Sequence, residues 1–200
     1  MTRVMVRPTA KTRKRRRQRR LITLLAYVVI VFSLAWFFES QGTTTVVFVR
    51  HADVNQPDSP AADAPLNATG LARAVLLAEF LEYADVVKSV DAVYVDETAR
   101  TQQTAAPLAK RLDLTPEVTN HEEVVAFMKA VLFEHKREIV LVVTQREDIA
   151  ALVAELHGHQ SIAEIGPGDY RNVYIVSIPW FGKVKTLQLP YANGWAPSAY

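Results

Sequence analysis

The sequence predicts an α/β fold, a three-layer α/β/α sandwich with a mostly parallel sheet, preceded by one transmembrane helix. Short β-branched runs such as Val46-Val47-Phe48-Val49 alternate with segments of helical spacing, which is typical of a parallel sheet covered by helices. The last two apolar runs follow each other without a helix between them, which predicts an antiparallel edge. An uncharged apolar segment near the N-terminus has the length of a membrane span.

The apolar segment covers residues 21–38 and reads LITLLAYVVIVFSLAWFF. Ten of the 23 basic residues lie before it, in residues 1–20, and no acidic residue occurs before Glu39. Because Lys and Arg beside a spanning helix favour the cytoplasmic side, residues 1–20 are expected to form a basic cytoplasmic tail. Residues 39–43 would then be a linker, and residues 44–200 one domain outside the cytoplasm, in the periplasm or extracellular space.

Two other interpretations of the apolar segment fit less well. A cleaved signal peptide has a shorter apolar region and a small-x-small cleavage site, and Phe38-Glu39-Ser40-Gln41 offers no good site. A buried core helix fits poorly because the segment is apolar all round and a dense basic cluster adjoins it.

Charge and composition exclude several classes of function for the domain. From Glu39 onward there are 13 basic and 21 acidic residues, so the net charge is 13 − 21 = −8, which disfavours a nucleic-acid partner. The basic run at residues 11–20 could bind nucleic acid, but the adjoining membrane segment explains it better. The chain has no cysteine, which excludes thiol catalysis, disulfides and cysteine-based metal sites. No metal-ligand spacing and no glycine-rich nucleotide loop occur, so no metal or cofactor is expected.

Six strands are expected after the linker. They are predicted at residues 46–49, 91–95, 117–119, 139–143, 173–178 and 183–189. The last two are separated by Pro179-Trp180-Phe181-Gly182 and predict a closing hairpin.

Four helices are expected between these strands. The first carries Leu71, Val75, Ala78 and Leu81 at helical spacing, and the second opens near Thr98 and contains Pro107, where it could kink. The third carries Val124, Phe127, Met128 and Val131, and the fourth Ile149, Leu152 and Leu156.

This architecture locates a site before any motif is considered. Ligands of open α/β sheets bind beyond the carboxyl ends of the strands. The loops at those ends are Arg50-His51-Ala52-Asp53, Asp96-Glu97, Asn120-His121-Glu122 and Thr144-Gln145-Arg146.

Arg50 and His51, at the end of the first strand, have side chains suited to phosphoryl transfer. A neutral imidazole can attack phosphorus, and a guanidinium offers a planar fork of donors to phosphoryl oxygens. Arg100 lies just inside a helix that follows the second strand, where the helix N-terminus adds partial positive charge. An isolated Arg-His pair would more simply be a surface or capping pair, so this interpretation depends on the two arginines coming together.

Six segments in order resemble the histidine phosphatase superfamily over nearly all of residues 43–189. They are VVFVRHADV, LNATGLARAVLLAEFL, DAVYVDETARTQQTAAPLA, EIVLVV, ALVAELHG and DYRNVYIVSIP. The resemblance implies that His51 is the nucleophile, and that Arg50 and Arg100 are phosphate ligands.

The chain departs from the family pattern after the last parallel strand. There the family has a Gly-His pair, and this chain has Thr144-Gln145, so Gln145 stands in place of the second active-site histidine. A glutamine amide can donate to a phosphate oxygen but carries no charge, and loss of such a donor lowers the rate about a hundredfold to a thousandfold. Arg146 could restore the charge or point to solvent.

Other candidates for proton transfer stay open. Five carboxylates compete for the role of general acid: Asp53, Asp58, Asp63, Glu97 and Glu122. Asp53 is nearest the signature and Glu97 opens the loop before Arg100, so both are kept as catalytic candidates. His121 is the only other histidine expected at this edge, although it is more simply a residue at a helix start; His135, His157 and His159 are expected to be structural or on the surface.

The sequence therefore predicts a membrane-anchored, histidine-phosphatase-like domain that binds a phosphorylated small molecule or phosphoprotein. Phosphomonoester hydrolysis through a phosphohistidine is expected to be weak or lost. The alternatives are a non-catalytic phosphate-binding or regulatory envelope protein, that is a pseudophosphatase, and an envelope scaffold whose pocket is vestigial.

Overall fold

The computed structural model describes residues 10–39, 42–55, 64–84, 90–119, 123–157 and 162–191. The chain divides into two compact units, residues 1–41 and 42–200. The first unit contains helix α1, Ala10–Glu39, which begins one residue before the basic run and so extends beyond the predicted span. Its segment Arg17–Phe37 has a mean hydropathy of 2.1 and is long and apolar enough to cross a membrane, a property that signal sequences share.

The second unit contains one mixed sheet of six strands in the order β3-β2-β4-β1-β5-β6. The strands are β1 Thr44–Arg50, β2 Ala92–Val95, β3 Glu117–Val118, β4 Ile139–Thr144, β5 Asn172–Ile178 and β6 Lys185–Pro190. The first four pair in parallel, while β5 runs antiparallel to β1 and to β6. The predicted mostly parallel sheet with an antiparallel edge and a closing hairpin is confirmed.

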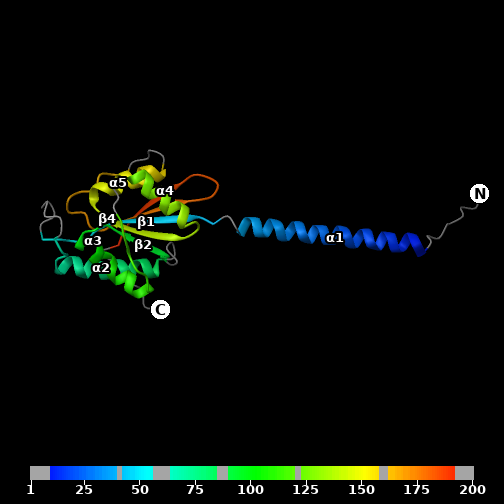
Figure 1. Ribbon diagram of the computed structural model, residues 1–200, viewed down its shortest axis with the longest axis horizontal. Coiled ribbons are helices and arrows are strands. Elements are labelled where there is room, and N and C mark those ends of the chain that lie inside the picture. Colours follow the sequence, from blue (N-terminus) through cyan, green and yellow to red (C-terminus); the bar gives the residue numbers. More distant parts are fainter. Residues whose placement is uncertain are drawn as a thin grey trace, which may run out of the picture. The chain divides into compact units, whose positions relative to one another are not determined.

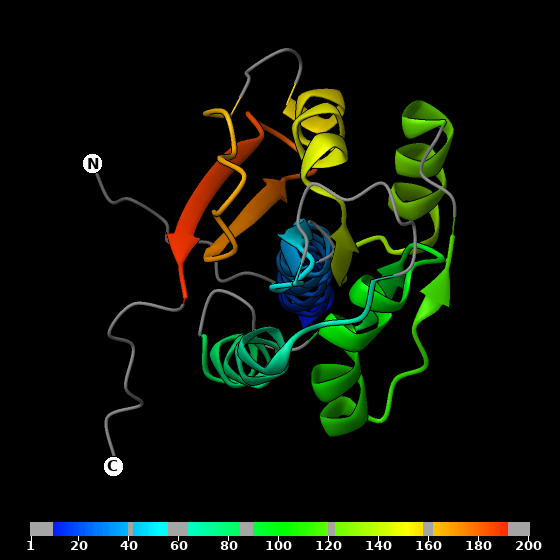
Figure 2. The same ribbon diagram turned by 90° about the vertical axis from the view of Figure 1, so that its left-hand side faces the viewer.

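Helices cover both faces of this sheet, as Figures 1 and 2 show. They are α2 Ala68–Tyr83, α3 Ala99–Leu112, α4 Val124–Glu134 and α5 Arg146–His157. Helices α2 and α3 pack on one face, and α4 and α5 on the other. The predicted three-layer sandwich is therefore confirmed, and α3 continues through Pro107 without ending there.

Strand β1 is buried on both faces because its side chains alternate between the two cores. Val47 and Val49 pack with apolar residues of α2 and α3, whereas Val46 and Phe48 pack with those of α4 and α5. All four side chains have no exposed surface. This explains why the strand is a continuous apolar run instead of an alternating one.

The buried face of α2 matches the predicted stripe only in part, because Ala78 and Leu81 are buried as expected but the first two residues are not. Leu71 and Val75 are exposed, by 51% and 42%, and the buried face instead passes through Gly70, Ala74 and Leu77. The rotation has a steric cause at the start of the helix, where a side-chain carbon on Gly70 would overlap the backbone of Asp53. Gly70 must therefore face the domain interior. Because side chains three and four residues apart share one face of a helix, the position of Gly70 determines which residues of α2 are buried.

Candidate active site

His51 lies at the carboxyl end of β1 and is 3% exposed. Its backbone N–H donates to the carbonyl oxygen of Thr144 at 3.1 Å, which ties it to the end of β4. Its Nδ1 lies 2.8 Å from the carbonyl oxygen of Ala52. Because a carbonyl can only accept, we assign the proton of the neutral ring to Nδ1, which leaves the lone pair of Nε2 available for attack.

The surroundings of His51 keep its ring neutral. Burial lowers the pKa of His51 to about 4; the bond to Ala52 opposes this shift, and the positive charges of Arg100 and Arg50 add to it. Both arginine charges therefore act on the imidazole. At neutral pH the ring is uncharged, which is the form that a nucleophile requires.

Arg50 is a buried cation whose guanidinium is held by the loop that precedes β5. Its Nη1 donates to the carbonyl oxygens of Gly166, Pro167 and Asp169, at 3.2, 2.6 and 3.3 Å. Its Cζ lies 3.9 Å from the centre of the Tyr170 ring, a cation–π contact. Burial lowers its pKa, and its Nε is buried without a hydrogen-bond partner in the part of the chain that the structure describes.

Arg100 resembles Arg50 in having a buried Nε that no described residue accepts from. Its helix is joined to the His51 loop through Thr104, whose hydroxyl donates to the backbone oxygen of Arg100 at 2.7 Å. The same hydroxyl accepts from the backbone N–H of Ala52 at 2.9 Å. Buried donors without partners are rare in folded proteins, and two such cations beside one imidazole are what an anion site requires.

Gln145 follows β4, and its amide is turned toward Asp96. Its Nε2 donates to a carboxylate oxygen of Asp96 and, at 3.2 Å, to the hydroxyl of Thr98. The other carboxylate oxygen accepts from Thr98 and from the hydroxyl of Thr101. Burial alone would raise the pKa of Asp96, but these hydrogen bonds outweigh it and lower the pKa.

Comparisons with known proteins agree with this geometry. The sequence model of the histidine phosphatase superfamily (branch 1) matches residues 46–123, which include Arg50, His51 and Arg100. The structure of the protein histidine phosphatase SixA complexed with tungstate is 23% identical, with a TM-score of 0.58, and the match covers 74% of this chain and 98% of that one. Residues 46–123 are thus similar in sequence to the histidine phosphatase superfamily, and the domain shares its fold with SixA.

Two further solved structures share the fold. A mycobacterial glucosyl-3-phosphoglycerate phosphatase in complex with VO3 is 15% identical, with a TM-score of 0.56 and coverage of 72% of this chain and 96% of that one. The structure titled mycobacterial hydrolase 1 is also 15% identical, with a TM-score of 0.56 and coverage of 75% and 99%. No curated protein matches the chain significantly.

The superfamily match ends at residue 123, before the segment that carries Gln145. Arg146, the next residue, is half-buried and pairs with Glu147, with Nη2 and Oε1 2.8 Å apart. Its charge nevertheless contributes to lowering the pKa of Arg50, so it lies near the rim of the site.

The two carboxylates predicted as catalytic candidates occupy different surroundings. Asp53 is half-buried and forms an ion pair with Arg73 of α2. Glu97 is exposed, and its backbone oxygen accepts from the amide of Gln102 at 3.1 Å. The structure therefore places one candidate in an ion pair and the other in solvent. Asp58, Asp63, Glu122 and His121 lie outside the described residues.

His135 has a structural role, as predicted. It follows the last residue of α4, and its ring bonds the hydroxyl of Tyr94 at 2.9 Å and the carboxylate of Glu138 at 2.7 Å. The side chain of His157 and all of His159 lie outside the described residues. Within the described residues, no group of three or more His, Asp or Glu side chains is placed to hold a metal ion.

Sequence reasoning missed two parts of the site. Asp96 was passed over for its neighbour Glu97, although it is the first residue after β2 and so begins the loop at the strand end. Tyr170 and the loop before β5 are not predicted, because the rule for the carboxyl ends of parallel strands does not cover the start of an antiparallel strand. An antiparallel strand begins at the edge where parallel strands end, and this signal would have found the loop.

Proposed function

We propose that this protein is a membrane-anchored member of the histidine phosphatase superfamily that binds a phosphorylated ligand and hydrolyses a phosphomonoester slowly. The observation that carries the proposal is the pair of buried Nε–H groups of Arg50 and Arg100, which have no acceptor among the described residues and whose charges act on the neutral ring of His51. A phosphate dianion would satisfy both donors and offset the burial of the two cations. Two solved structures of similar fold were determined in complex with tungstate and with VO3. Both are oxyanions, as phosphate is.

The chemistry would proceed in two displacements on phosphorus. His51 Nε2 attacks, a bond from nitrogen to phosphorus forms, and the bond from phosphorus to the leaving oxygen breaks. Water then attacks the phosphohistidine, releasing inorganic phosphate and restoring the neutral ring. The two arginines bind the phosphoryl oxygens throughout, where negative charge is largest.

The slow rate follows from two features of the site. The Nε2–H groups of Gln145 donate to Asp96 and Thr98, so the amide gives the phosphoryl group neither a charge nor a ready donor. Asp53 is paired with Arg73, so protonation of the leaving oxygen by this carboxylate requires that pair to open. Glu97 is the accessible alternative. Esters with good leaving groups, which need less protonation, should be the better substrates.

A non-catalytic phosphate-binding function is the second candidate. The bond from Gln145 to Asp96 favours it, because a site that binds phosphate does not need a donor for the transition state. The same arginines and His51 would then hold a phosphorylated small molecule or phosphoprotein without turnover.

The membrane anchor is supported by α1, whose segment Arg17–Phe37 is long and apolar enough to span a bilayer. The basic residues before this segment favour a cytoplasmic N-terminus, which puts the domain outside the cytoplasm. The phosphorylated ligand would accordingly be met in the periplasm or the extracellular space.

Turnover of an aryl phosphate by the full-length chain in lipid nanodiscs tests the proposal. Substitution His51→Ala should abolish release of the phenol, whereas the control His135→Gln, at a histidine outside the site, should retain it. Turnover by His51→Ala equal to that of the wild type would contradict the proposed hydrolysis through His51. Stabilisation by vanadate without turnover would support the binding function, and the absence of both would support a scaffold.

A further inference from the structure

Apolar and basic side chains are exposed together at the edge of the sheet where β1 begins. Thr44 pairs with Ile178, so the turn between β5 and β6 lies at this edge. The backbone N–H of Arg137 donates to the hydroxyl of Thr44 at 2.9 Å, so the end of α4 lies there too. We name this surface the strand-start edge. Its residues are Phe133, Lys136, Arg137, Trp180, Phe181, Lys183 and Lys185.

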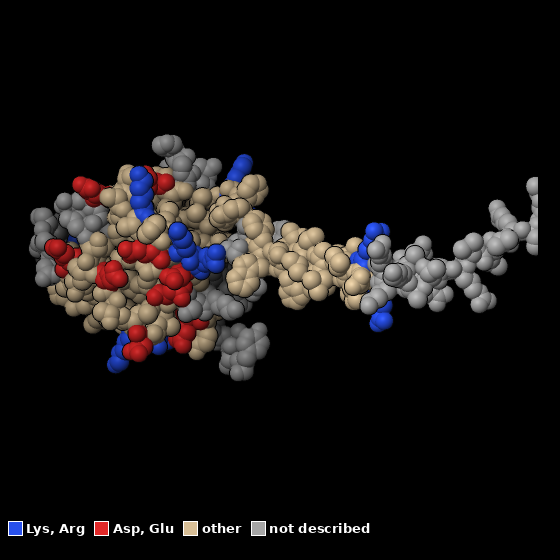
Figure 3. Space-filling model, turned by 45° about the vertical axis from the view of Figure 1, so that its right-hand side comes forward, with Lys and Arg blue, Asp and Glu red and all other residues tan. Residues whose placement is uncertain are grey.

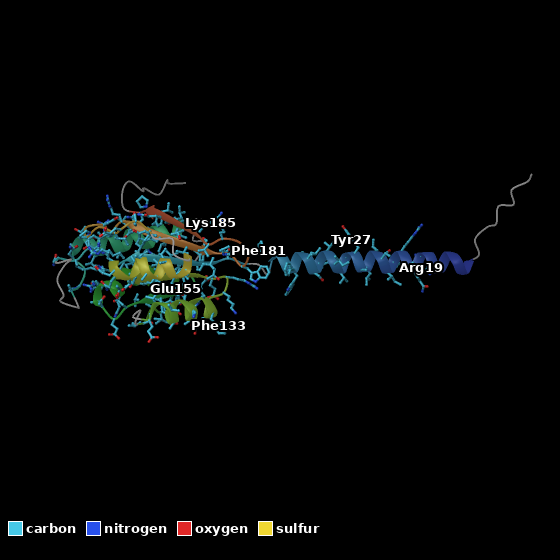
Figure 4. All side chains as sticks on the ribbon, turned by 90° about the horizontal axis from the view of Figure 1, so that it is seen from above. Arg19, Tyr27, Phe133, Glu155, Phe181 and Lys185 are labelled. Atoms are coloured by element: carbon cyan, nitrogen blue, oxygen red, sulfur yellow. The ribbon has the colours of Figure 1, made fainter. Side chains whose placement is uncertain are left out.

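The aromatic residues of the strand-start edge are unusually exposed. Phe181 is 86% exposed, Phe133 73% and Trp180 67%. Figure 4 shows Phe181 and Phe133 at the same end of the domain. Lys136 Nζ lies 4.8 Å from the centre of the Phe133 ring, so a cation accompanies an exposed aromatic. Exposed apolar groups gathered on one surface mark an interaction site.

The charge of the strand-start edge is opposite to that of the domain. The domain carries a net charge of −8 from Glu39 onward, and acidic side chains are spread over the face seen in Figure 3. Four of its 13 basic residues nevertheless belong to the strand-start edge. Three acidic residues lie at the same edge: Glu134, Glu138, which bonds His135, and Asp91, which accepts from the backbone N–H of Ile139 beside Thr45. The basic residues therefore outnumber the acidic ones there, four to three. Aromatic and basic side chains together are typical of surfaces that contact lipid headgroups.

The short connection between α1 and β1 limits how far Thr44, at the strand-start edge, can lie from the end of α1. Helix α1 ends at Glu39 and β1 begins at Thr44, so 44 − 39 = 5 peptide units join them. Five extended residues span at most about 18 Å. If α1 crosses the membrane, this covalent limit keeps Thr44, where the strand-start edge begins, within about 18 Å of the end of the membrane helix.

We propose that the strand-start edge docks on the lipid surface from which the chain emerges. Trp180 and Phe181 enter the interfacial region, and the lysines and arginine lie against acidic headgroups. The proposal rests on the membrane anchor of the proposed function and is independent of the phosphate pocket. Because β1 runs from this edge toward His51, the pocket opens on the side of the domain away from the lipid.

Fluorescence of a single tryptophan tests the docking in the full-length chain. Trp36→Phe and Trp195→Phe leave Trp180 alone, and nanodiscs with acidic lipids brominated near the headgroup supply the quencher. The matched control adds Trp180→Phe and Val125→Trp. Val125 is 46% exposed and lies at the opposite end of α4 from Phe133. Quenching of Trp180 should be several-fold larger than that of the control, with emission shifted to shorter wavelength.

Each other result has a distinct meaning. Quenching of Trp180 no larger than that of the control would overturn the docking while leaving the anchor intact. Equal quenching in discs of neutral lipid would overturn the role of the basic residues. A chain that does not float with liposomes after alkaline washing would overturn the anchor and the docking with it. Stabilisation by vanadate, measured separately, reports on the phosphate pocket alone.

Discussion

At the scale of single residues, the central feature is a neutral histidine whose ring feels the charges of the buried Arg50 and the partly buried Arg100. An unperturbed histidine has a pKa near 6.5, and this environment lowers that of His51 to about 4. The same burial that prepares Nε2 for attack therefore opposes protonation of the folded chain. The lowered pKa of His51 therefore makes the free energy of unfolding depend on pH.

Stability should fall below neutral pH because of His51. Between pH 6.5 and 4 the unfolded chain binds a proton that the folded chain does not, so folding stability is fully present above pH 6.5 and declines toward pH 4. The loss attributable to this residue is about 3 kcal/mol. Urea unfolding of the wild type and of His51→Ala at pH 7 and pH 4.5 measures it. If the free energy of unfolding fell by the same amount between pH 7 and pH 4.5 in both chains, the result would contradict a buried, neutral ring at His51.

Gln145→His should raise turnover about a hundredfold, since it returns a charged donor to the position that the family pattern assigns to histidine. Asp96, which now accepts from the glutamine, would hold the new imidazole in place and favour its charged form. Steady-state hydrolysis of an aryl phosphate checks this prediction. Gln145→Leu removes the amide without adding charge and should show no gain; a gain there, or none with histidine, counts against the account.

The residues that could be predicted from the sequence are those fixed by a local signature. Arg50 is the last residue of β1, His51 follows it, and Arg100 is in the first turn of α3. Asp96 and Tyr170 could not be found in this way, because their roles depend on which strands are neighbours. The pairing of Asp96 with Gln145 joins residues 49 positions apart and exists only because β2 lies beside β4.

At the scale of elements, the contact between α2 and the His51 loop connects the fold to the site. Asn67 caps α2 by accepting from the backbone N–H of Gly70 at 2.8 Å. Gly70 lies against the backbone of Asp53, two residues after His51. The position of His51 thus depends on how closely the start of this helix can approach the end of β1.

Gly70→Ala should lower the free energy of unfolding by about 1–3 kcal/mol, because the added carbon overlaps backbone atoms that cannot rotate away. Gly168→Ala is the matched control, since a side-chain carbon there meets nothing within 4 Å. Chemical denaturation of both variants gives the comparison. Equal stability of the two would show that the contact between helix and loop is looser than described.

Most helices and strands could be predicted from the sequence, but the order of the strands in the sheet and the buried face of α2 could not. The composition of β1 and β4 marks them as strands buried on both faces. The strand order and the buried face of α2 depend on contacts between distant segments, and periodicity alone cannot supply them. Leu71 and Val75 fit the helical spacing and are nevertheless exposed.

At the scale of the whole molecule, His51 and the strand-start edge lie at opposite ends of β1. The strand runs from Thr44 to Arg50, which at about 3.3 Å per residue separates them by about 20 Å. Docking of the strand-start edge on lipid would therefore keep the phosphate pocket in the aqueous phase.

The ligand should accordingly be a soluble phosphate or a phosphoprotein and not a phospholipid of the same bilayer. In nanodiscs that contain phosphatidic acid, the chain should release phosphate from an added aryl phosphate and none from the lipid. Phosphate release from each substrate, assayed with and without His51→Ala, separates the two. Release from phosphatidic acid that depends on His51 would contradict this orientation.

The site as a whole depends on Arg50, Arg100 and His51 binding one oxyanion together. A crystal structure of the protein with vanadate tests this most directly. We predict vanadium bonded to His51 Nε2, with the Nε atoms of Arg50 and Arg100 donating to its oxygens. Vanadate bound away from His51, or an arginine turned from it in the complex, would contradict the account.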